Sequence, residues 1–146
     1  MKTFPLKTCL RYPGGKSKAI KTLAPWFPEN FSEYREPFIG GGSVAFYIAQ
    51  AYPNVPIWIN DKYVSLYNFW IQLRDRGEEL SNKLDDIKRE ASNYQFQADV
   101  DIAHEELFNK TLESINDQDE LDRAVSFFIL NKCSFSGLTE NSTFSK

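Results

Sequence analysis

A run of three glycines, followed about 20 residues later by an aspartate, is the part of this sequence best suited to hold a nucleotide-like ligand. Gly40, Gly41 and Gly42 separate an apolar segment from a helix-forming one, and Asp61 follows the next apolar segment. Glycines let a ligand approach the backbone, a helix N-terminus offers free N–H groups, and an acid at this distance can accept hydrogen bonds from both ribose hydroxyls. The spacing therefore predicts a nucleotide-binding turn.

Two phosphate-binding patterns can be compared with the glycines of this chain. Gly40, Gly42 and Ala45 satisfy the Gly-x-Gly-x-x-Ala pattern of dinucleotide-binding domains, so NAD or FAD is an alternative ligand. A second glycine pair ends at Gly15 and is followed by lysine and serine, as at the end of a P-loop. That motif also needs a glycine at position 10, where Leu10 stands, so the P-loop interpretation is excluded.

The scarcity of cysteine and histidine excludes several other chemistries. Cys9 and Cys133 are far apart in the sequence, and His104 is the single histidine. These residues cannot assemble a zinc site or a Ser-His or Cys-His catalytic pair. We therefore expect no metal in the functional site.

Charge is distributed unevenly along the chain. The net charge of -3 argues against a protein that grips nucleic acid over its whole surface, because phosphate contacts depend on Lys and Arg. From Met1 to Pro28, however, every charged side chain is positive, whereas the stretch 78–122 is rich in acids. The basic N-terminal stretch is therefore the part suited to face a polyanion.

Hydrophobic periodicity and breaker residues predict the elements that must position the turn. One βαβ crossover runs from Glu33 to Asp61, and it consists of a strand at 33–38, a helix at 43–50 and a strand at 55–60. Most of the remainder is predicted to be helical, with breaks at Asp99 and at Asp117–Asp119. The predicted helices span 16–27, 63–75, 77–95, 101–115 and 120–132. The Ser- and Thr-rich end, 134–146, is predicted to be loop.

Four blocks of the sequence stand out when they are taken together. They are Arg11–Lys16, Glu36–Val44, Ile59–Asp61 with Ser65–Asn68, and Ala124–Leu138. In order and spacing they resemble the Dam-type, or D12 class, S-adenosylmethionine-dependent DNA adenine-N6 methyltransferases. The resemblance favours a methyl donor over a dinucleotide, because the Phe-x-Gly-x-Gly turn and the upstream Gly-Gly-Lys are features of that family.

The resemblance implies a cofactor pocket for S-adenosyl-L-methionine. The cofactor-binding residues that it implies are Tyr12, Lys16, Phe38, Gly40, Gly42 and Asp61. Asp61 would hold the ribose, because a carboxylate that accepts two hydroxyl bonds makes charge-assisted contacts. An aromatic ring such as that of Tyr12 suits an adenine or a sulfonium cation.

The resemblance also implies contacts with double-stranded DNA. Arg11 takes the position from which the family reaches toward a base edge or a phosphate. Phe135 takes the place of an aromatic residue that inserts into the base stack, and Ser136 that of a polar residue that contacts DNA. A buried loop anchor is the alternative role for Phe135.

The acceptor loop that adenine-N6 methylation requires is missing from this sequence. That loop has the form (Asp/Asn)-Pro-Pro-(Tyr/Phe) and binds the amino group of the flipped base. None of the seven prolines here is followed by another proline. We therefore expect no catalytic residue in the chain, which we interpret as a truncated and inactive form of a site-specific DNA adenine-N6 methyltransferase. The alternative is a non-catalytic DNA- or partner-binding module.

The fold class expected from these features is α/β, with a partial Rossmann-like methyltransferase sheet followed by a mainly helical segment that begins the DNA-recognition region. We expect residues 1–76 to be the N-terminal part of the cofactor-binding domain and residues 77–146 to lead into target recognition. A second chain, or self-association, would complete the sheet. No stretch is long and apolar enough to span a bilayer, so we expect a cytoplasmic protein.

Overall fold

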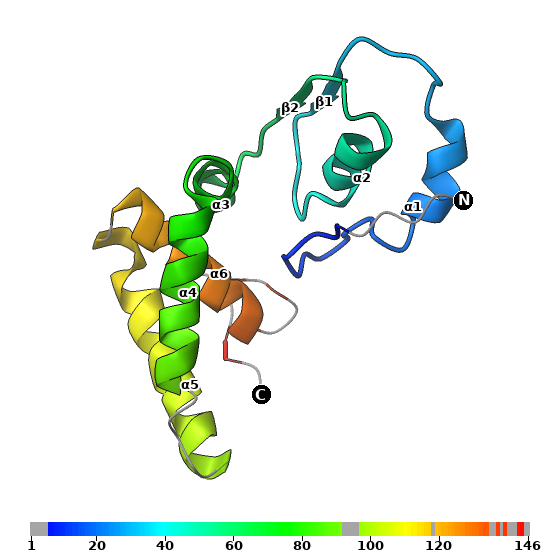
Figure 1. The fold of residues 1–146 in the computed structure, drawn as a ribbon. Helices are drawn as coiled ribbons and strands as arrows, with labels where there is room; N and C mark the ends of the chain where they lie inside the picture. Colours follow the sequence, from blue (N-terminus) through cyan, green and yellow to red (C-terminus); the bar gives the residue numbers. More distant parts are fainter. Residues whose placement is uncertain are drawn as a thin grey trace. The chain divides into compact units, whose positions relative to one another are not determined.

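The computed structural model describes residues 6–91, 97–117, 119–134, 137, 139, 143 and 144 (Figure 1). The chain divides into two compact units between Lys62 and Tyr63. The first unit contains a small parallel sheet and the second is helical. The mixed α/β class expected from the sequence is thus present, whereas the functional boundary near residue 76 stays a prediction.

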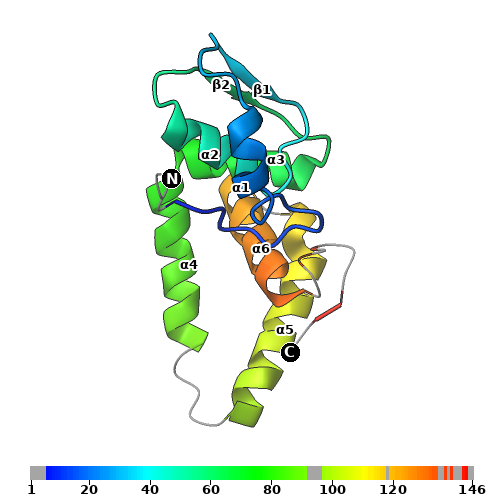
Figure 2. The same cartoon turned by 90° about the vertical axis from the view of Figure 1, so that its right-hand side faces the viewer.

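The first unit is built around the predicted strand–helix–strand crossover. Strand β1 (Tyr34–Glu36) pairs in parallel with β2 (Ile57–Ile59), and helix α2 (Ser43–Ala51) connects them. The strands lie side by side in both ribbon views (Figures 1 and 2). Helix α2 follows the glycine turn directly, and it buries Ala45 and Ile48. The crossover predicted from the apolar runs and the glycines is therefore confirmed.

The pairing of the two strands continues past their carboxyl ends. The N–H of Asn60 donates to the carbonyl of Glu36 at 3.0 Å, and the N–H of Ile39 donates to the carbonyl of Asn60 at 2.9 Å. These two bonds carry the register beyond the strands and hold the chain that leaves β1 beside the chain that leaves β2. The glycine turn and Asp61 consequently start from the same edge of the sheet.

The segment before the sheet is less helical than its sequence predicts. A helix was expected over 16–27, but only α1 (Ile20–Leu23) and a short 3-10 helix (Ala24–Trp26) form, after turns at 17–19. Pro25 explains the change of helix type, because proline has no N–H to donate to the carbonyl four residues earlier. The α-helix therefore ends before it.

The second unit is a set of helices gathered around α6 (Glu120–Cys133). Helices α3 (Val64–Asp75), α4 (Gly77–Ala91) and α5 (Gln97–Ser114) all contact α6, and a short 3-10 helix (Ile115–Asp117) precedes it. The apolar residues that α6 buries are Leu121, Ala124, Val125, Phe127, Ile129 and Leu130. A helix that is apolar over so much of its surface must lie inside, and α6 does.

Aromatic rings fill the contact between α3 and α6. The side chain of Phe69 is fully buried, and its ring centroid lies 5.5 Å from that of Phe127 and 5.9 Å from that of Phe128. Trp70 packs edge-on to Phe69 at 5.3 Å. Burial of several large rings at one contact makes this cluster the main apolar core of the helical unit.

Acidic residues at the helix starts explain one correct and one wrong prediction. Asp119 caps α6, because its side chain accepts a hydrogen bond from the N–H of Asp122 at 2.9 Å, and that bond lowers the pKa of Asp119. The predicted break before α6 is thus confirmed. The predicted break at Asp99 is wrong, since α5 begins at Gln97 and continues through it. An acid in the first turn of a helix is favoured by the helix dipole.

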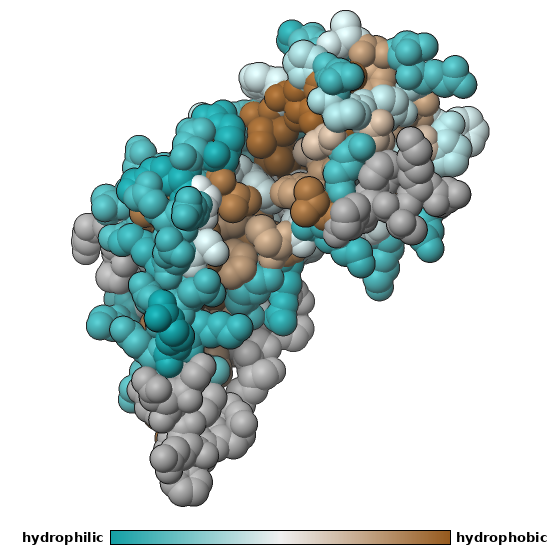
Figure 3. Space-filling view, viewed as in Figure 1, coloured by the Kyte–Doolittle hydropathy of each residue, from teal (hydrophilic) through white to brown (hydrophobic). Residues whose placement is uncertain are grey.

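The face of the helical unit that Figure 3 shows is mostly hydrophilic, with some hydrophobic residues among the polar ones. In the same view, hydrophobic residues gather near the strands of the first unit. Among the residues that the structure describes, no helix combines the length and the apolar character needed to cross a membrane.

Replacing Phe69 with alanine tests the aromatic core of the helical unit. Phe69→Ala should lower the free energy of unfolding by about 3–5 kcal/mol, because it removes a fully buried ring and leaves a cavity. Val64→Ala, in the same helix but 68% exposed, is the matched control and should change it by less than about 0.5 kcal/mol. Urea titrations followed by circular dichroism measure both, and equal midpoints for the two variants would contradict this core.

Candidate functional site

One hydrogen bond joins the glycine turn to the acid that follows the second strand. The backbone N–H of Gly40 donates to Oδ2 of Asp61 at 2.9 Å. Asp61 is half-buried and stands two residues beyond the end of β2. The structure therefore brings together the two features that the sequence singled out, at the carboxyl edge of the sheet where open α/β proteins bind ligands.

The glycines of this turn are required by backbone conformation and by a neighbouring ring. Gly40 and Gly42 have φ values of +49° and +74°, in the left-handed region that side chains rarely adopt. A Cβ atom at Gly40 would lie 2.8 Å from Cε1 of Tyr12, and one at Gly41 would lie 2.8 Å from Cβ of Tyr12. Tyr12 thus packs directly on the turn, which only glycine permits.

The upstream turn that carries Tyr12 is held by its own hydrogen bonds. The N–H of Gly15 donates to the carbonyl of Tyr12 at 2.9 Å, and the ammonium of Lys16 donates to the carbonyl of Gly14 at 2.7 Å. Next to it, the hydroxyls of Ser17 and Ser43 share a hydrogen bond of 2.8 Å. This last bond ties the upstream segment to the first residue of α2.

Electrostatics link Tyr12 to the acid of the site. Partial burial, together with the negative charge of Asp61, raises the pKa of the Tyr12 phenol. The phenol therefore stays neutral at physiological pH and presents a ring and a hydroxyl, rather than a second negative charge, beside Asp61.

The remaining predicted cofactor and DNA residues of this unit are solvent-exposed. The ring of Phe38 is 77% exposed just before the glycine turn, and the side chains of Lys16 and Arg11 are exposed as well. Of the six predicted cofactor residues, Tyr12, Gly40, Gly42 and Asp61 form one cluster. Phe38 and Lys16 lie on the segments that lead into that cluster.

Glu36 is a neighbour of the site that the sequence analysis did not single out. It is the last residue of β1 and is half-buried, and its Oε2 atom is buried with no hydrogen-bond partner among the residues that the structure describes. Burial raises the pKa of Glu36 above its usual value. An acid shortly before a glycine turn was the available signal, but only the structure shows that one of its oxygens is buried.

The predicted DNA-contact residues Phe135 and Ser136 lie outside the described residues. Around them, three buried polar groups hold the chain after α6. The amide of Asn131 donates to the carbonyl of Gly137 at 3.2 Å, and the N–H of Thr139 donates to Oγ of Ser134 at 3.1 Å. The hydroxyls of Tyr63 and Thr139 are 2.9 Å apart. The end of the sequence, predicted to be loop, is thus anchored at these points.

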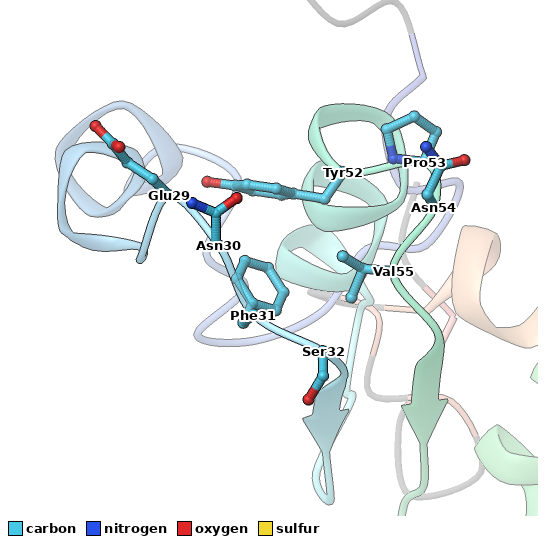
Figure 4. Close-up of a pocket in the computed structure, with 8 residues that line it drawn as sticks. All are labelled: Glu29, Asn30, Phe31, Ser32, Tyr52, Pro53, Asn54 and Val55. Atoms are coloured by element: carbon cyan, nitrogen blue, oxygen red, sulfur yellow. The ribbon is translucent and has the colours of Figure 1, made fainter.

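A separate hollow of about 450 Å³ lies at the other end of the sheet (Figure 4). Its walls come from the residues just before β1 and β2, and the rings of Phe31 and Tyr52 pack there with centroids 4.7 Å apart. Ligands of open α/β sheets bind at the carboxyl ends of the strands, so this hollow is not the nucleotide site.

The described residues hold no group of three or more His, Cys, Asp or Glu side chains able to bind a metal ion.

Comparison with known proteins places the chain in a family. The sequence pattern of the D12 class N6 adenine-specific DNA methyltransferases matches residues 12–144, and the chain therefore belongs to this family. It is 32% identical to the type II methyltransferase M.MjaIII of Methanocaldococcus jannaschii, over 91% of this chain and 47% of that protein.

Two further relatives agree with this assignment. The type II methyltransferase M1.LlaDCHI of Lactococcus lactis subsp. cremoris is 28% identical, over 91% of this chain and 43% of its own length. The DNA N-6-adenine-methyltransferase of Escherichia phage P1 is 30% identical, over 91% of this chain and 16% of its own length. The chain thus spans less than half the length of each of these curated relatives.

Alanine substitution of glycines tests the packing of the turn. Gly40→Ala should lower the free energy of unfolding by about 1–3 kcal/mol, because the new Cβ collides with the Tyr12 ring at a positive φ. Gly77→Ala is the matched control: it begins α4, meets only Leu73 at 3.9 Å, and should be neutral or stabilising by up to about 1 kcal/mol. Thermal unfolding measures both, and equal stabilities would show that the turn tolerates a side chain.

Proposed function

We propose that this chain is the donor-binding part of a DNA adenine-N6 methyltransferase and that it binds S-adenosyl-L-methionine at the glycine turn. The observation that carries the proposal is the hydrogen bond from the Gly40 N–H to Asp61. At the carboxyl edge of a parallel sheet, this bond places a carboxylate next to a stretch of backbone that a ligand can approach closely. An adenosine ribose can be bound by this arrangement.

The residues of the turn fit such a cofactor. One oxygen of Asp61 receives the Gly40 N–H, and a carboxylate has further lone pairs with which to accept ribose hydroxyls. The exposed ring of Phe38 offers an apolar surface for an adenine, and the neutral ring of Tyr12 offers one for an adenine or a sulfonium. Gly40 and Gly42 keep the backbone open to close approach, while Lys16 lies on the adjacent turn.

The bound donor would supply a methyl group activated by the positive sulfonium. The work of this chain's own residues is to bind and orient that donor, which lowers the entropic cost of the reaction. The adenine amino group needs further partners that free its lone pair. Because these 146 residues contain no Pro-Pro pair, we propose that such partners come from another segment, in the same or a second chain, and that this polypeptide by itself is inactive.

Double-stranded DNA is the proposed partner. The exposed Arg11 on the basic N-terminal stretch would contact a phosphate or a base edge. Phe135 and Ser136, which follow the end of α6, would add a stacking and a polar contact. The buried bonds from Asn131, Ser134 and Thr139 support this assignment, because they fix the backbone on either side of these two residues.

Removing the carboxylate of Asp61 tests donor binding. Asp61→Ala should weaken the binding of S-adenosylhomocysteine by about 1.5–3 kcal/mol, the cost of losing charged hydrogen bonds. Asp86→Ala, which removes an exposed acid from α4, is the matched control and should leave the affinity unchanged. Isothermal titration calorimetry gives both values. A wild-type chain that binds while Asp61→Ala binds equally well would remove Asp61 from the ribose site.

Methyl transfer by the purified chain tests the division of the reaction between segments. We expect no detectable transfer of labelled methyl to duplex DNA by these 146 residues alone, because their sequence contains no Asp-Pro-Pro-Tyr-type loop to bind the adenine amino nitrogen. Activity should return when a segment carrying an Asp-Pro-Pro-Tyr-type loop is added. Robust methylation by the chain alone, in a preparation free of host methyltransferases, would refute this division.

A further inference from the structure

One residue of the helical unit has a strained backbone. Thr139 has a φ of +53°, and among the described residues it is the single non-glycine residue with a positive φ. A β-branched residue rarely adopts this left-handed conformation, because its side chain then crowds the backbone. Such strain persists only where the surrounding structure holds it, and it is concentrated at functional sites.

Hydrogen bonds to two helix ends hold Thr139 in this conformation. Its N–H donates at 3.1 Å to Oγ of Ser134, the C-cap residue of α6. Its hydroxyl lies 2.9 Å from the hydroxyl of Tyr63, the N-cap residue of α3. Thr139 is only 3% exposed and Ser134 is fully buried, so water does not compete for these bonds. The strained residue is thus tied to the end of one helix and to the start of another.

The ring of Tyr63 gives its hydroxyl a rigid support. The ring packs edge-on against that of Phe127, with centroids 5.9 Å apart, and Phe127 is buried in α6. A glycine at position 139 would adopt the left-handed conformation without strain. The threonine therefore contributes something that a glycine lacks, and the structure shows its hydroxyl in contact with that of Tyr63.

The chain on either side of Thr139 is anchored at further points. Ser134 and Phe144 form an antiparallel bridge, which brings two distant points of the segment after α6 together. The amide of Asn131 donates to the carbonyl of Gly137 at 3.2 Å, and Asn131 is fully buried. Satisfied networks of buried polar groups rigidify the chain and specify one conformation. At these points the segment therefore has a defined backbone.

We propose that Tyr63 is a positioning residue for DNA binding, whose hydroxyl holds Thr139 and thereby sets the backbone of the segment that follows α6. The inference rests on the proposed function, which assigns the DNA contacts of Phe135 and Ser136 to this segment. Tyr63 acts through Thr139 and needs no contact with DNA of its own. A segment already held in its binding conformation binds more tightly, because less conformational entropy is lost on association.

Removing one hydroxyl group tests the proposal. Tyr63→Phe deletes the contact with Thr139 and keeps the ring that packs on Phe127. Tyr67→Phe, one turn further along α3 and 43% exposed, is the matched control. Fluorescence anisotropy with a labelled adenine-containing duplex, at one fixed salt concentration, measures the affinity of each folded chain. Tyr63→Phe should weaken binding by about three- to tenfold, as expected for the loss of one hydrogen bond, and Tyr67→Phe should leave it unchanged.

Substitutions at Thr139 separate positioning from a merely structural role. Thr139→Val removes the same contact from the other side, whereas Thr139→Ser keeps a hydroxyl and should bind DNA about as tightly as the wild type. The double variant of Tyr63→Phe and Thr139→Val should bind as weakly as either single variant, because both remove one bond. A merely structural role would lower the free energy of unfolding and leave the affinity of the folded chains unchanged. Wild-type affinity in Tyr63→Phe, or losses that add up in the double variant, would overturn the proposal.

Failure of the proposed function would be recognised separately. If the wild-type chain binds no duplex, its DNA contact is refuted and hydrogen exchange decides the role of Tyr63. The N–H groups of Gly137 and Thr139 both donate to Ser134, so their exchange rates report on this backbone. Faster exchange of these two amides in Tyr63→Phe, with unchanged rates in α6, supports a hydroxyl that holds the segment. Unchanged rates at both amides, or an equal rise throughout α6, contradict it. Thr139→Val is measured in the same way should Tyr63→Phe not fold.

Discussion

The bond between the Gly40 N–H and the Asp61 carboxylate is the constraint on which the first unit depends. It can form only because β1 and β2 run parallel in a register that sets Glu36 opposite Ile59, so that both chains leave the sheet at one edge. It also requires a left-handed backbone conformation at position 40 and enough space there for the ring of Tyr12. The strand register, the glycine at position 40 and the packing of Tyr12 thus all contribute to this one hydrogen bond.

Asp61 and Glu36, the two acids at this edge of the sheet, differ in their effect on the stability of the fold. Asp61 is half-buried and satisfied in part by the Gly40 N–H, whereas burial raises the pKa of Glu36, whose Oε2 has no hydrogen-bond partner among the described residues. A carboxyl group whose pKa is raised on folding stabilises the fold at low pH, and this contribution is lost as the pH rises through its folded pKa. An ionised Glu36 therefore opposes folding at pH values above its folded pKa.

Local sequence signals predicted the parts of the structure that are governed locally. The glycines, the apolar runs and Asp61 predicted the crossover and the acid–glycine pairing, because β-strand and turn preferences act over a few residues. The predicted break at Asp99 and the predicted helix over 16–27 were wrong, because α5 continues through Asp99 and the chain is helical only from Ile20 to Trp26, where Pro25 changes the helix type. The packing of Tyr12 on Gly40 and the hydrogen bond between Ser17 and Ser43 join distant residues, which no local pattern reveals.

The division between the two units falls within a very short piece of chain. Asp61 makes the bond that closes the glycine turn, and Tyr63, two residues later, is the N-cap residue of α3 and shares a hydrogen bond with Thr139. A single residue, Lys62, separates the last anchor of one unit from the first anchor of the other. The joint between the two units is therefore limited to the backbone of Lys62, because the residues on either side of it are each held within their own unit.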